Sequence, residues 1–215
     1  MIINILAGGP VEHLPKLEAF HEENSVWVGV DRGVFTLISM GIQPSIAFGD
    51  FDSVSKDELE LIQSRVGTMK KFNPEKDEPD MELALEWALQ TRPTKIRLFG
   101  GTGGRLDHFL ANVQLLIKTS LQHEACPIEL IDRQNIMFVK GPGSYVLEKC
   151  KQKKYISFIP KSEFIADLTL EGFKYPLKNR HIPLHSTLCI SNELISDYGT
   201  FSFTKGILLV IRSTD

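Results

Sequence analysis

The chain has few cysteines, and none of them are spaced as a metal or redox motif requires. Its 215 residues include only Cys126, Cys150 and Cys189, and no C-x-x-C occurs. An odd and widely spaced set predicts neither a disulfide framework nor a zinc site. The thiols are expected to be buried or idle, and a reducing cytoplasm is the compartment that fits them.

Long apolar runs and an excess of positive charge are also missing. No segment is apolar over the roughly 20 residues that are needed to cross a bilayer. Residues 1–9 are apolar but lack a basic start and run into a glycine turn, which predicts a buried first strand and not a signal peptide. The net charge of −3 gives no electrostatic case for nucleic acid. Neither a membrane nor a nucleic acid is expected as a partner.

Strand and helix patterns alternate along the first two thirds of the chain. Strands are expected at residues 2–7, 26–30, 46–48, 68–72, 95–99, 128–131 and 136–139, and helices at residues 32–40, 55–65, from about 79, and from about 106. The last helix is expected to bury one apolar face made of Leu106, Phe109, Leu110, Val113, Leu116 and Ile117. Ser55 and Glu58 have the spacing of a capping box. Alternation of this kind predicts a mostly parallel sheet with helices on its faces.

The pattern changes at Gly141-Pro142-Gly143-Ser144. Residues 166–172 and 200–204 alternate apolar and polar side chains, and residues 206–211 form an apolar run. These are the marks of antiparallel strands with one face in water. We therefore expect an α/β domain at residues 1–140 and an all-β domain at residues 141–215.

Polar motifs follow three of the expected strands. Asp31, Asp50 and the run Gly100–Gly104 each come directly after a strand of the parallel sheet. In open α/β sheets, ligands bind at the edge formed by the carboxyl ends of the strands. The sequence therefore predicts one crevice lined by carboxylates and glycines.

Asp50 and Asp52 project the same way from an extended chain and could share a hard cation such as Mg²⁺. The alternative is an Asx-turn that caps the following helix. Asp77 and Asp80 flank Pro79 at the start of another helix. Acidic residues there complement the helix dipole, yet Asp80 aligns with the buried stripe and could be a third metal ligand. Asp77 is expected to contact the metal ligands and not the metal itself.

The run Gly100–Gly104 is neither a Walker A loop nor a G-x-G-x-x-G motif. Glycines can expose backbone N–H groups at a helix start to a phosphate group, although a plain tight turn is the alternative. Downstream of the run, Arg105 could neutralise charge on a phosphoryl group. Asp107 could accept a proton or orient a nucleophile.

For two further features, a structural role is favoured over a catalytic or binding role. His108 shares a helical stripe with Arg105 and Asn112, and it is expected to be a capping or interface histidine more than a general base. The basic run at residues 149–154 is expected to be a solvated loop more than a phosphate or membrane patch.

Taken in order, these motifs resemble the thiamine pyrophosphokinase family. The matching segments are Asp31-Arg32-Gly33, Gly49-Asp50-Phe51-Asp52-Ser53, Asp77 through Ala84, Gly100 through Asn112, Gly172 through Leu177, and Ser191-Asn192-Glu193. The resemblance implies a Rossmann-like α/β domain, a C-terminal antiparallel β-sandwich that binds thiamine and forms the dimer, and a homodimer with active sites between subunits. It implies transfer of the terminal diphosphate of ATP to the hydroxyethyl group of thiamine, giving thiamine diphosphate and AMP.

The resemblance also implies roles for individual residues. Mg²⁺ is expected on Asp50, Asp52 and Asp80, with Arg105 and Asp107 as further catalytic residues. ATP is expected to contact Asp31, Asp77, Gly101, Thr102, Gly103, Gly104 and Arg105. Thiamine is expected to contact Asp107, Tyr175, Ser191 and Asn192. A metal-dependent nucleotide phosphohydrolase and a non-catalytic nucleotide-binding regulator are the alternative functions.

Overall fold

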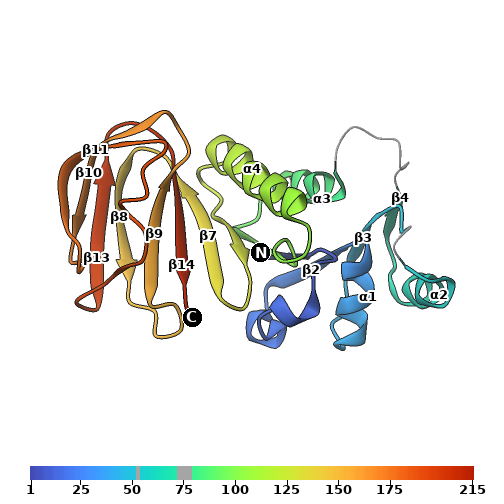
Figure 1. The fold of residues 1–215 in the computed structure, drawn as a ribbon. Coiled ribbons are helices and arrows are strands. Elements are labelled where there is room, and N and C mark those ends of the chain that lie inside the picture. The colour runs from blue at the N-terminus through green and yellow to red at the C-terminus, as the bar shows by residue number, and fades with distance from the viewer. Residues whose placement is uncertain (52–53, 72–78) are drawn as a thin grey trace. The chain divides into compact units, whose positions relative to one another are not determined.

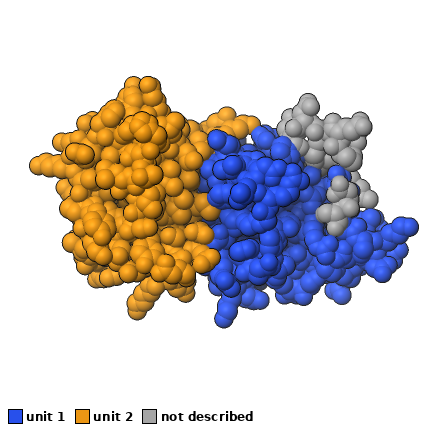
Figure 2. Space-filling view, viewed as in Figure 1, with its two compact units in different colours: residues 1–116, 123–133 blue, residues 117–122, 134–215 orange. Residues whose placement is uncertain are grey.

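The computed structural model describes residues 1–51, 54–71 and 79–215 (Figure 1). The chain divides into two compact units (Figure 2). The first holds residues 1–116 and 123–133, and the second holds residues 117–122 and 134–215. This division by contacts places residues 117–122 and 134–140, which were expected in the α/β domain, in the second unit. The division into functional domains at residues 1–140 and 141–215 stays a prediction.

The first unit is built on a parallel sheet. Its strands are β1 (Ile2–Leu6), β2 (Ser25–Val30), β3 (Ile46–Gly49), β4 (Met69–Lys71), β5 (Lys95–Phe99) and β6 (Ile128–Ile131). They lie in the order β6-β5-β1-β2-β3-β4, and each neighbouring pair is parallel. Ile3 and Ile5 of the central strand β1 are fully buried, as expected for a strand covered on both faces. The mostly parallel sheet is confirmed.

Helices cover both faces of this sheet. They are α1 (Arg32–Ser39), α2 (Lys56–Arg65), α3 (Asp80–Gln90) and α4 (Leu106–Gln122), with short 3₁₀ turns η1 (Val11–His13) and η2 (Leu17–Phe20). Figure 1 shows α3 and α4 above the sheet and α1 below it, with α2 packed beside α1. The Ser55 hydroxyl accepts from the Glu58 N–H, and the Glu58 carboxylate accepts from the Ser55 N–H, so the predicted capping box starts α2.

The expected apolar face of α4 is wrong over its first two turns. Leu106 is 75% exposed and Leu110 is 58% exposed, whereas Val113, Leu115 and Leu116 are buried. Helical spacing shows which side chains share a side of the helix, but not how far the sheet beneath that side extends. The first two turns of α4 therefore present leucines to solvent in the single chain.

The second unit is a sandwich of two antiparallel sheets. Its strands are β7 (Asn135–Lys140), β8 (Gly143–Glu148), β9 (Tyr155–Pro160), β10 (Phe164–Glu171), β11 (Leu177–Pro183), β12 (Asn192–Glu193), β13 (Tyr198–Phe203) and β14 (Leu208–Ser213). One sheet has the order β12-β9-β14-β7 and the other β11-β10-β13-β8. Phe158 from the first sheet and Phe201 from the second meet in the core with ring centroids 5.0 Å apart. The predicted β-sandwich is confirmed.

A bulge in β10 interrupts the alternation expected at residues 166–172. Ile165, Leu168 and Leu170 are buried, and the pairing with β11 shifts register between Ile165 and Leu168. Asp167 adopts a left-handed conformation with φ 57°. The extra residue moves the inward position from 166 to 165, which is the usual effect of a bulge.

In the part of the chain that the structure describes, no helix is long and apolar enough to cross a membrane.

The packing of α1 onto β1 predicts a strong effect of one methyl group. A Cβ at Gly33 would lie 2.1 Å from the Leu6 carbonyl oxygen, whereas a Cβ at Gly67 would meet no atom within 4 Å. We expect Gly33→Ala to lower the free energy of unfolding by about 1–3 kcal/mol or more. Gly67→Ala is the matched control and should change it by less than about 0.5 kcal/mol. Urea unfolding of both variants measures the difference, and equal midpoints would contradict the packing.

Candidate functional site

Three polar segments leave the carboxyl edge of the parallel sheet. Asp31 follows β2, Asp50 follows β3, and Gly100 follows β5. Because β5, β1, β2 and β3 are parallel neighbours, their carboxyl ends lie at one edge. This is the position at which α/β sheets bind ligands. The predicted grouping of these segments at one edge is therefore present.

The acidic side of this edge is held by a close approach at Gly49. The Asp31 N–H donates to the Phe48 carbonyl oxygen at 2.8 Å. A Cβ at Gly49 would lie 2.1 Å from Asp31 Oδ1 and 3.1 Å from its carboxyl carbon. Only a residue without a side chain lets the Asp31 carboxylate occupy that space. Asp31 and the chain that carries Asp50 are thus packed against each other.

A strained turn then carries Asp50 away from the sheet. Gly49 has φ 139° and Phe51 has φ 61°, and a left-handed phenylalanine costs roughly 1–3 kcal/mol. The Phe51 ring is only 4% exposed and packs in a cluster with Val34, Ala47, Ile62 and Val66. Its burial offsets that cost and fixes the backbone that presents Asp50. Asp52 lies outside the described residues.

The glycine side consists of two glycine turns packed together. The Gly9 N–H donates to the Gly100 carbonyl oxygen at 3.0 Å. A Cβ at Gly9 would lie 2.3 Å from that oxygen, and a Cβ at Gly100 would lie 2.3 Å from the Ala7 carbonyl oxygen. The sequence predicts residues 8 and 9 only as the turn after a strand. Their contact with Gly100 assigns them to the site, and no local sequence pattern shows that contact.

Further along the run, Gly103 and Gly104 have φ 76° and 66° and are exposed, so their backbone is accessible to a ligand. The His13 ring lies against Gly103, where a Cβ would come within 2.7 Å of it. His13 was not anticipated as a neighbour of the site, because it is some 90 positions away in the sequence. Gly101 and Thr102 are buried.

Asn112 supports the glycine run from α4. Its Nδ2 donates to the Gly101 carbonyl oxygen at 3.0 Å, and the residue is half-buried. Arg105 and His108, which were expected on the same stripe, are exposed. Asn112 therefore has a positioning role, since its side chain fixes the backbone of the run.

Arg105 and Asp107 form an ion pair at the start of α4. Arg105 Nη2 donates to Asp107 Oδ2 at 2.6 Å, and Arg105 Nε donates to Oδ1 at 3.1 Å. The His108 N–H also donates to Oδ1, at 3.0 Å. The hydrogen bonds from Arg105 lower the pKa of Asp107 to about 2. A carboxylate with so low a pKa accepts protons poorly at neutral pH, which favours the orienting role over that of a general base.

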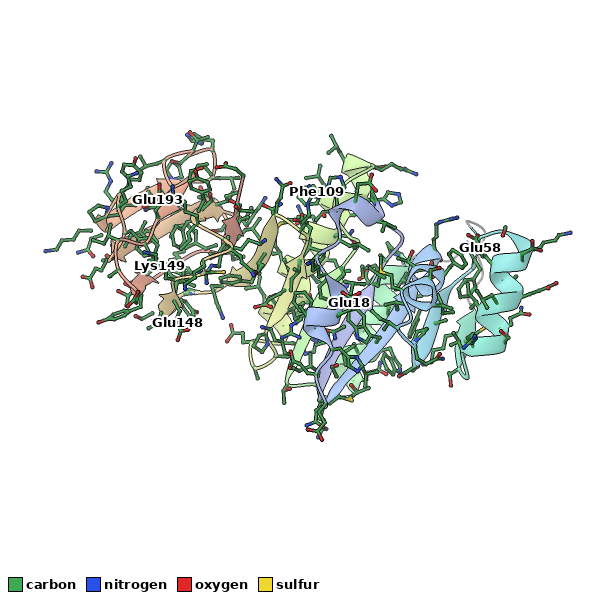
Figure 3. All side chains as sticks on the ribbon, turned by 90° about the horizontal axis from the view of Figure 1, so that it is seen from below. Glu18, Glu58, Phe109, Glu148, Lys149 and Glu193 are labelled. Atoms are coloured by element: carbon green, nitrogen blue, oxygen red, sulfur yellow. The ribbon has the colours of Figure 1, made fainter. Side chains whose placement is uncertain are left out.

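The acidic and glycine sides meet through the end of β1 and the start of α1. A Cβ at Gly8 would lie 3.3 Å from Arg32 Cβ, and Arg32 directly follows Asp31. Arg32 Nη2 donates to Glu58 Oε1 at 3.0 Å, and Glu58 lies at the start of α2 (Figure 3). This ion pair joins α1, which follows β2 and Asp31, to α2, which follows β3 and Asp50.

The remaining metal-ligand candidates are only partly described. Asp80 is the first residue of α3 and is half-buried, and α3 packs on β1, β2 and β3. Asp77 lies outside the described residues. Among residues 1–51, 54–71 and 79–215, no group of three histidine, cysteine or acidic side chains is arranged to hold a metal ion. The expected set includes Asp52, so that set stays a prediction.

In the β-sandwich, Asn192 holds Tyr175 by its backbone. Asn192 is 2% exposed, accepts from the Tyr175 N–H at 3.0 Å and donates to the Tyr175 carbonyl oxygen at 2.8 Å. The Tyr175 side chain is 58% exposed, with Lys174 Nζ 5.6 Å from its ring centroid. The Ser191 N–H donates to Ser157 Oγ at 3.0 Å. Asn192 thus presents the Tyr175 ring to solvent.

Comparisons with known proteins agree over the whole chain. Residues 17–130 match the family model described as thiamin pyrophosphokinase, catalytic domain, and residues 144–208 match the one described as thiamin pyrophosphokinase, vitamin B1 binding domain. The chain is 53% identical over 216 residues to thiamine pyrophosphokinase of Bacillus subtilis (strain 168), covering 99% of both proteins.

Solved structures give the same match. The crystal structure of thiamine pyrophosphokinase from Bacillus subtilis is 52% identical, with a TM-score of 0.94 and complete coverage of both chains. The structure of thiamin pyrophosphokinase from Geobacillus thermodenitrificans is 51% identical, with a TM-score of 0.91 over 100% of this chain and 98% of that chain.

The ion pair on α4 makes a prediction about titration. Arg105→Gln removes the main cause of the low pKa of Asp107, so that pKa should rise from about 2 towards the ordinary value of 3.8. Arg180→Gln, an exposed arginine on β11, should leave it at about 2. Because the folded-state pKa is the lower one, the contribution of this pair is complete above pH 3.8 and is lost as the pH falls through 2. Carboxyl NMR titration measures it; an unchanged pKa in Arg105→Gln would contradict the pairing.

Proposed function

The chain belongs to the thiamin pyrophosphokinase family, and from this we infer that it transfers the terminal diphosphate of ATP to the hydroxyethyl group of thiamine, giving thiamine diphosphate and AMP. The observation that carries the inference is the match of both family models in order, together with 53% identity along the full length to a thiamine pyrophosphokinase. The phosphohydrolase and regulator alternatives are not favoured, because neither accounts for a vitamin B1 binding domain beside the catalytic one.

We propose that Asp50, Asp52 and Asp80 hold Mg²⁺. The residues present fit a hard cation: Asp50 leaves the ligand-binding edge of the sheet, and the side chain missing at Gly49 leaves room for the neighbouring Asp31 carboxylate. When bound, Mg²⁺ supplies positive charge that neutralises phosphate oxygens. Asp31 and Asp77 are proposed to contact the nucleotide beside the metal, and neither is proposed as a metal ligand.

The glycine run is proposed to hold the phosphates of ATP. Backbone N–H groups of Gly101, Thr102, Gly103 and Gly104 would donate to phosphate oxygens, with the run held in place by Gly9 and Asn112. Arg105 would add a fixed positive charge where negative charge develops during transfer. Its two hydrogen bonds to Asp107 restrict its orientation. Asp107 is accordingly proposed to position Arg105 and the thiamine alcohol, and not to take the proton.

Thiamine is proposed to bind against Tyr175, with Ser191 and Asn192 beside it. Thiamine carries a permanent positive charge, and an aromatic face attracts a cation. Lys174 already lies over the Tyr175 ring and donates to Glu193 Oε1 at 3.2 Å, which leaves the opposite face for the substrate. Asn192 would act through Tyr175 by fixing its backbone.

We further propose a homodimer in a reducing cytoplasm. Leu106 and Leu110 are large apolar side chains exposed beside the Arg105–Asp107 pair, and a second copy of the chain would cover them. The three cysteines are unpaired, as a reducing compartment favours.

One assay tests the reaction and the metal-binding role together. We expect Asp50→Asn to lower kcat by about 10²-fold or more while the variant stays folded, because it removes a charge that holds the metal–nucleotide complex. Asp57→Asn, an exposed acid on α2, is the control and should keep wild-type turnover. AMP and thiamine diphosphate are measured with ATP, Mg²⁺ and thiamine.

Two results of that assay would contradict the proposal. AMP release by the wild type without thiamine, at the rate seen with thiamine, would indicate hydrolysis. Wild-type turnover by Asp50→Asn would remove Asp50 from the metal site and leave the reaction itself intact.

A further inference from the structure

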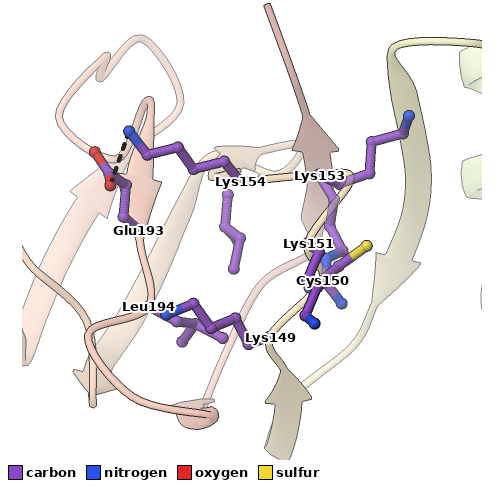
Figure 4. Close-up of a pocket in the computed structure, with 9 residues that line it drawn as sticks. Lys149, Cys150, Lys151, Lys153, Lys154, Glu193 and Leu194 are labelled. Carbon is purple, nitrogen blue, oxygen red and sulfur yellow. Dashed lines mark ion pairs between the residues drawn. The ribbon is translucent and has the colours of Figure 1, made fainter.

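The β-sandwich contains a cavity lined mainly by cations. Its volume is about 280 Å³, and its lining includes Lys149, Lys151, Lys153, Lys154, Glu193 and Arg212 (Figure 4). Most of these residues come from the segment between β8 and β9, with Glu193 on β12 and Arg212 on β14. Residues 149, 151, 152 and 154 of the basic run are exposed, as expected for a solvated loop, and the run also forms a wall of a hollow.

Positive charge in the cavity exceeds negative charge. Five of the lining residues are cationic and one is acidic, and that carboxylate is already shared: Glu193 Oε2 lies 3.3 Å from Lys154 Nζ and Oε1 lies 3.2 Å from Lys174 Nζ. Figure 4 shows Lys154 and Lys149 on opposite sides of the hollow and the Lys153 ammonium extending away from it. Apart from Lys153 and Lys154, the lining cations are Lys149, Lys151 and Arg212, and their positive charge attracts an anion.

Arg212 adds a fixed positive charge to this wall. One of its Nη groups donates to the Glu148 carbonyl oxygen, and its position on β14, between β7 and β9, holds its backbone on both sides. Its Nε is buried and has no hydrogen-bond partner in the part of the chain that the structure describes. Because water does not reach this Nε, Arg212 acts on the hollow through its positive charge and not through a hydrogen bond from Nε.

We propose that this cavity binds a small phosphate-class anion, a phosphate or diphosphate group. Ammonium and guanidinium groups are the side chains that bind such oxyanions in proteins. The volume equals that of about nine liquid water molecules, which suits one or two phosphate groups better than a whole nucleotide. None of the residues proposed to contact ATP or thiamine lines the cavity, although Glu193 borders the thiamine site through its pair with Lys174.

The test follows backbone amides of the full-length protein by NMR during titration with inorganic pyrophosphate at constant ionic strength. We expect saturable shifts at residues 149–154 and at Arg212. The double variant Lys149→Gln/Lys151→Gln should weaken this response about 10-fold. Lys16→Gln/Lys178→Gln removes the same charge from exposed positions elsewhere and should leave the response unchanged. Shifts at residues 100–104 report the ATP site separately and should persist in both variants.

Three outcomes would overturn the proposal. They are the absence of saturable shifts at residues 149–154, equal weakening in the two double variants, and the same shifts with chloride at matched ionic strength. Unchanged amide positions outside the cavity show that each variant is folded.

Discussion

Parallel pairing of β1 with β2 on one side and β5 on the other is the constraint on which the rest of the site depends. Parallel strands end at one edge, so Asp31, the chain leading to Asp50 and the glycine run are brought together although they are far apart in the sequence. The helices that follow these strands begin at the same edge, which turns their N–H ends towards it. The chemistry therefore follows from topology before any single side chain is considered.

Close backbone approach is what makes this edge usable. Gly9 and Gly100 pack where no side chain could fit, and Gly33 does the same between α1 and the end of β1. Phe51 adds to this, because its buried ring stabilises the left-handed turn after Gly49. In the sandwich, Asn192 has the equivalent role for Tyr175. At both places the backbone that carries a proposed binding group is fixed by contacts from a neighbouring residue.

Much of this was predictable from local patterns, and the failures have physical causes. Apolar periodicity predicted the strands and the sandwich, and the Ser55–Glu58 spacing predicted its capping box, because each depends on neighbours in sequence. Leu106 and Leu110 were wrongly expected to be buried, since burial depends on what lies opposite. The contacts of His13 with Gly103 and of Asn192 with Tyr175 join distant segments, and no local pattern encodes them. The metal set of Asp50, Asp52 and Asp80 remains a prediction, because Asp52 lies outside the described residues.

The central claim is that the acids and the glycine run grip one metal–nucleotide complex. Replacing Mg²⁺ by paramagnetic Mn²⁺ in the presence of a non-hydrolysable ATP analogue tests it most directly, because Mn²⁺ broadens the NMR signals of nearby amides. The account predicts strong broadening of the amide signals of Asp31 and Asp50 and of Gly101–Gly104. It predicts little broadening on the outer face of α2. Broadening at only one of the two segments, or at neither, would contradict it.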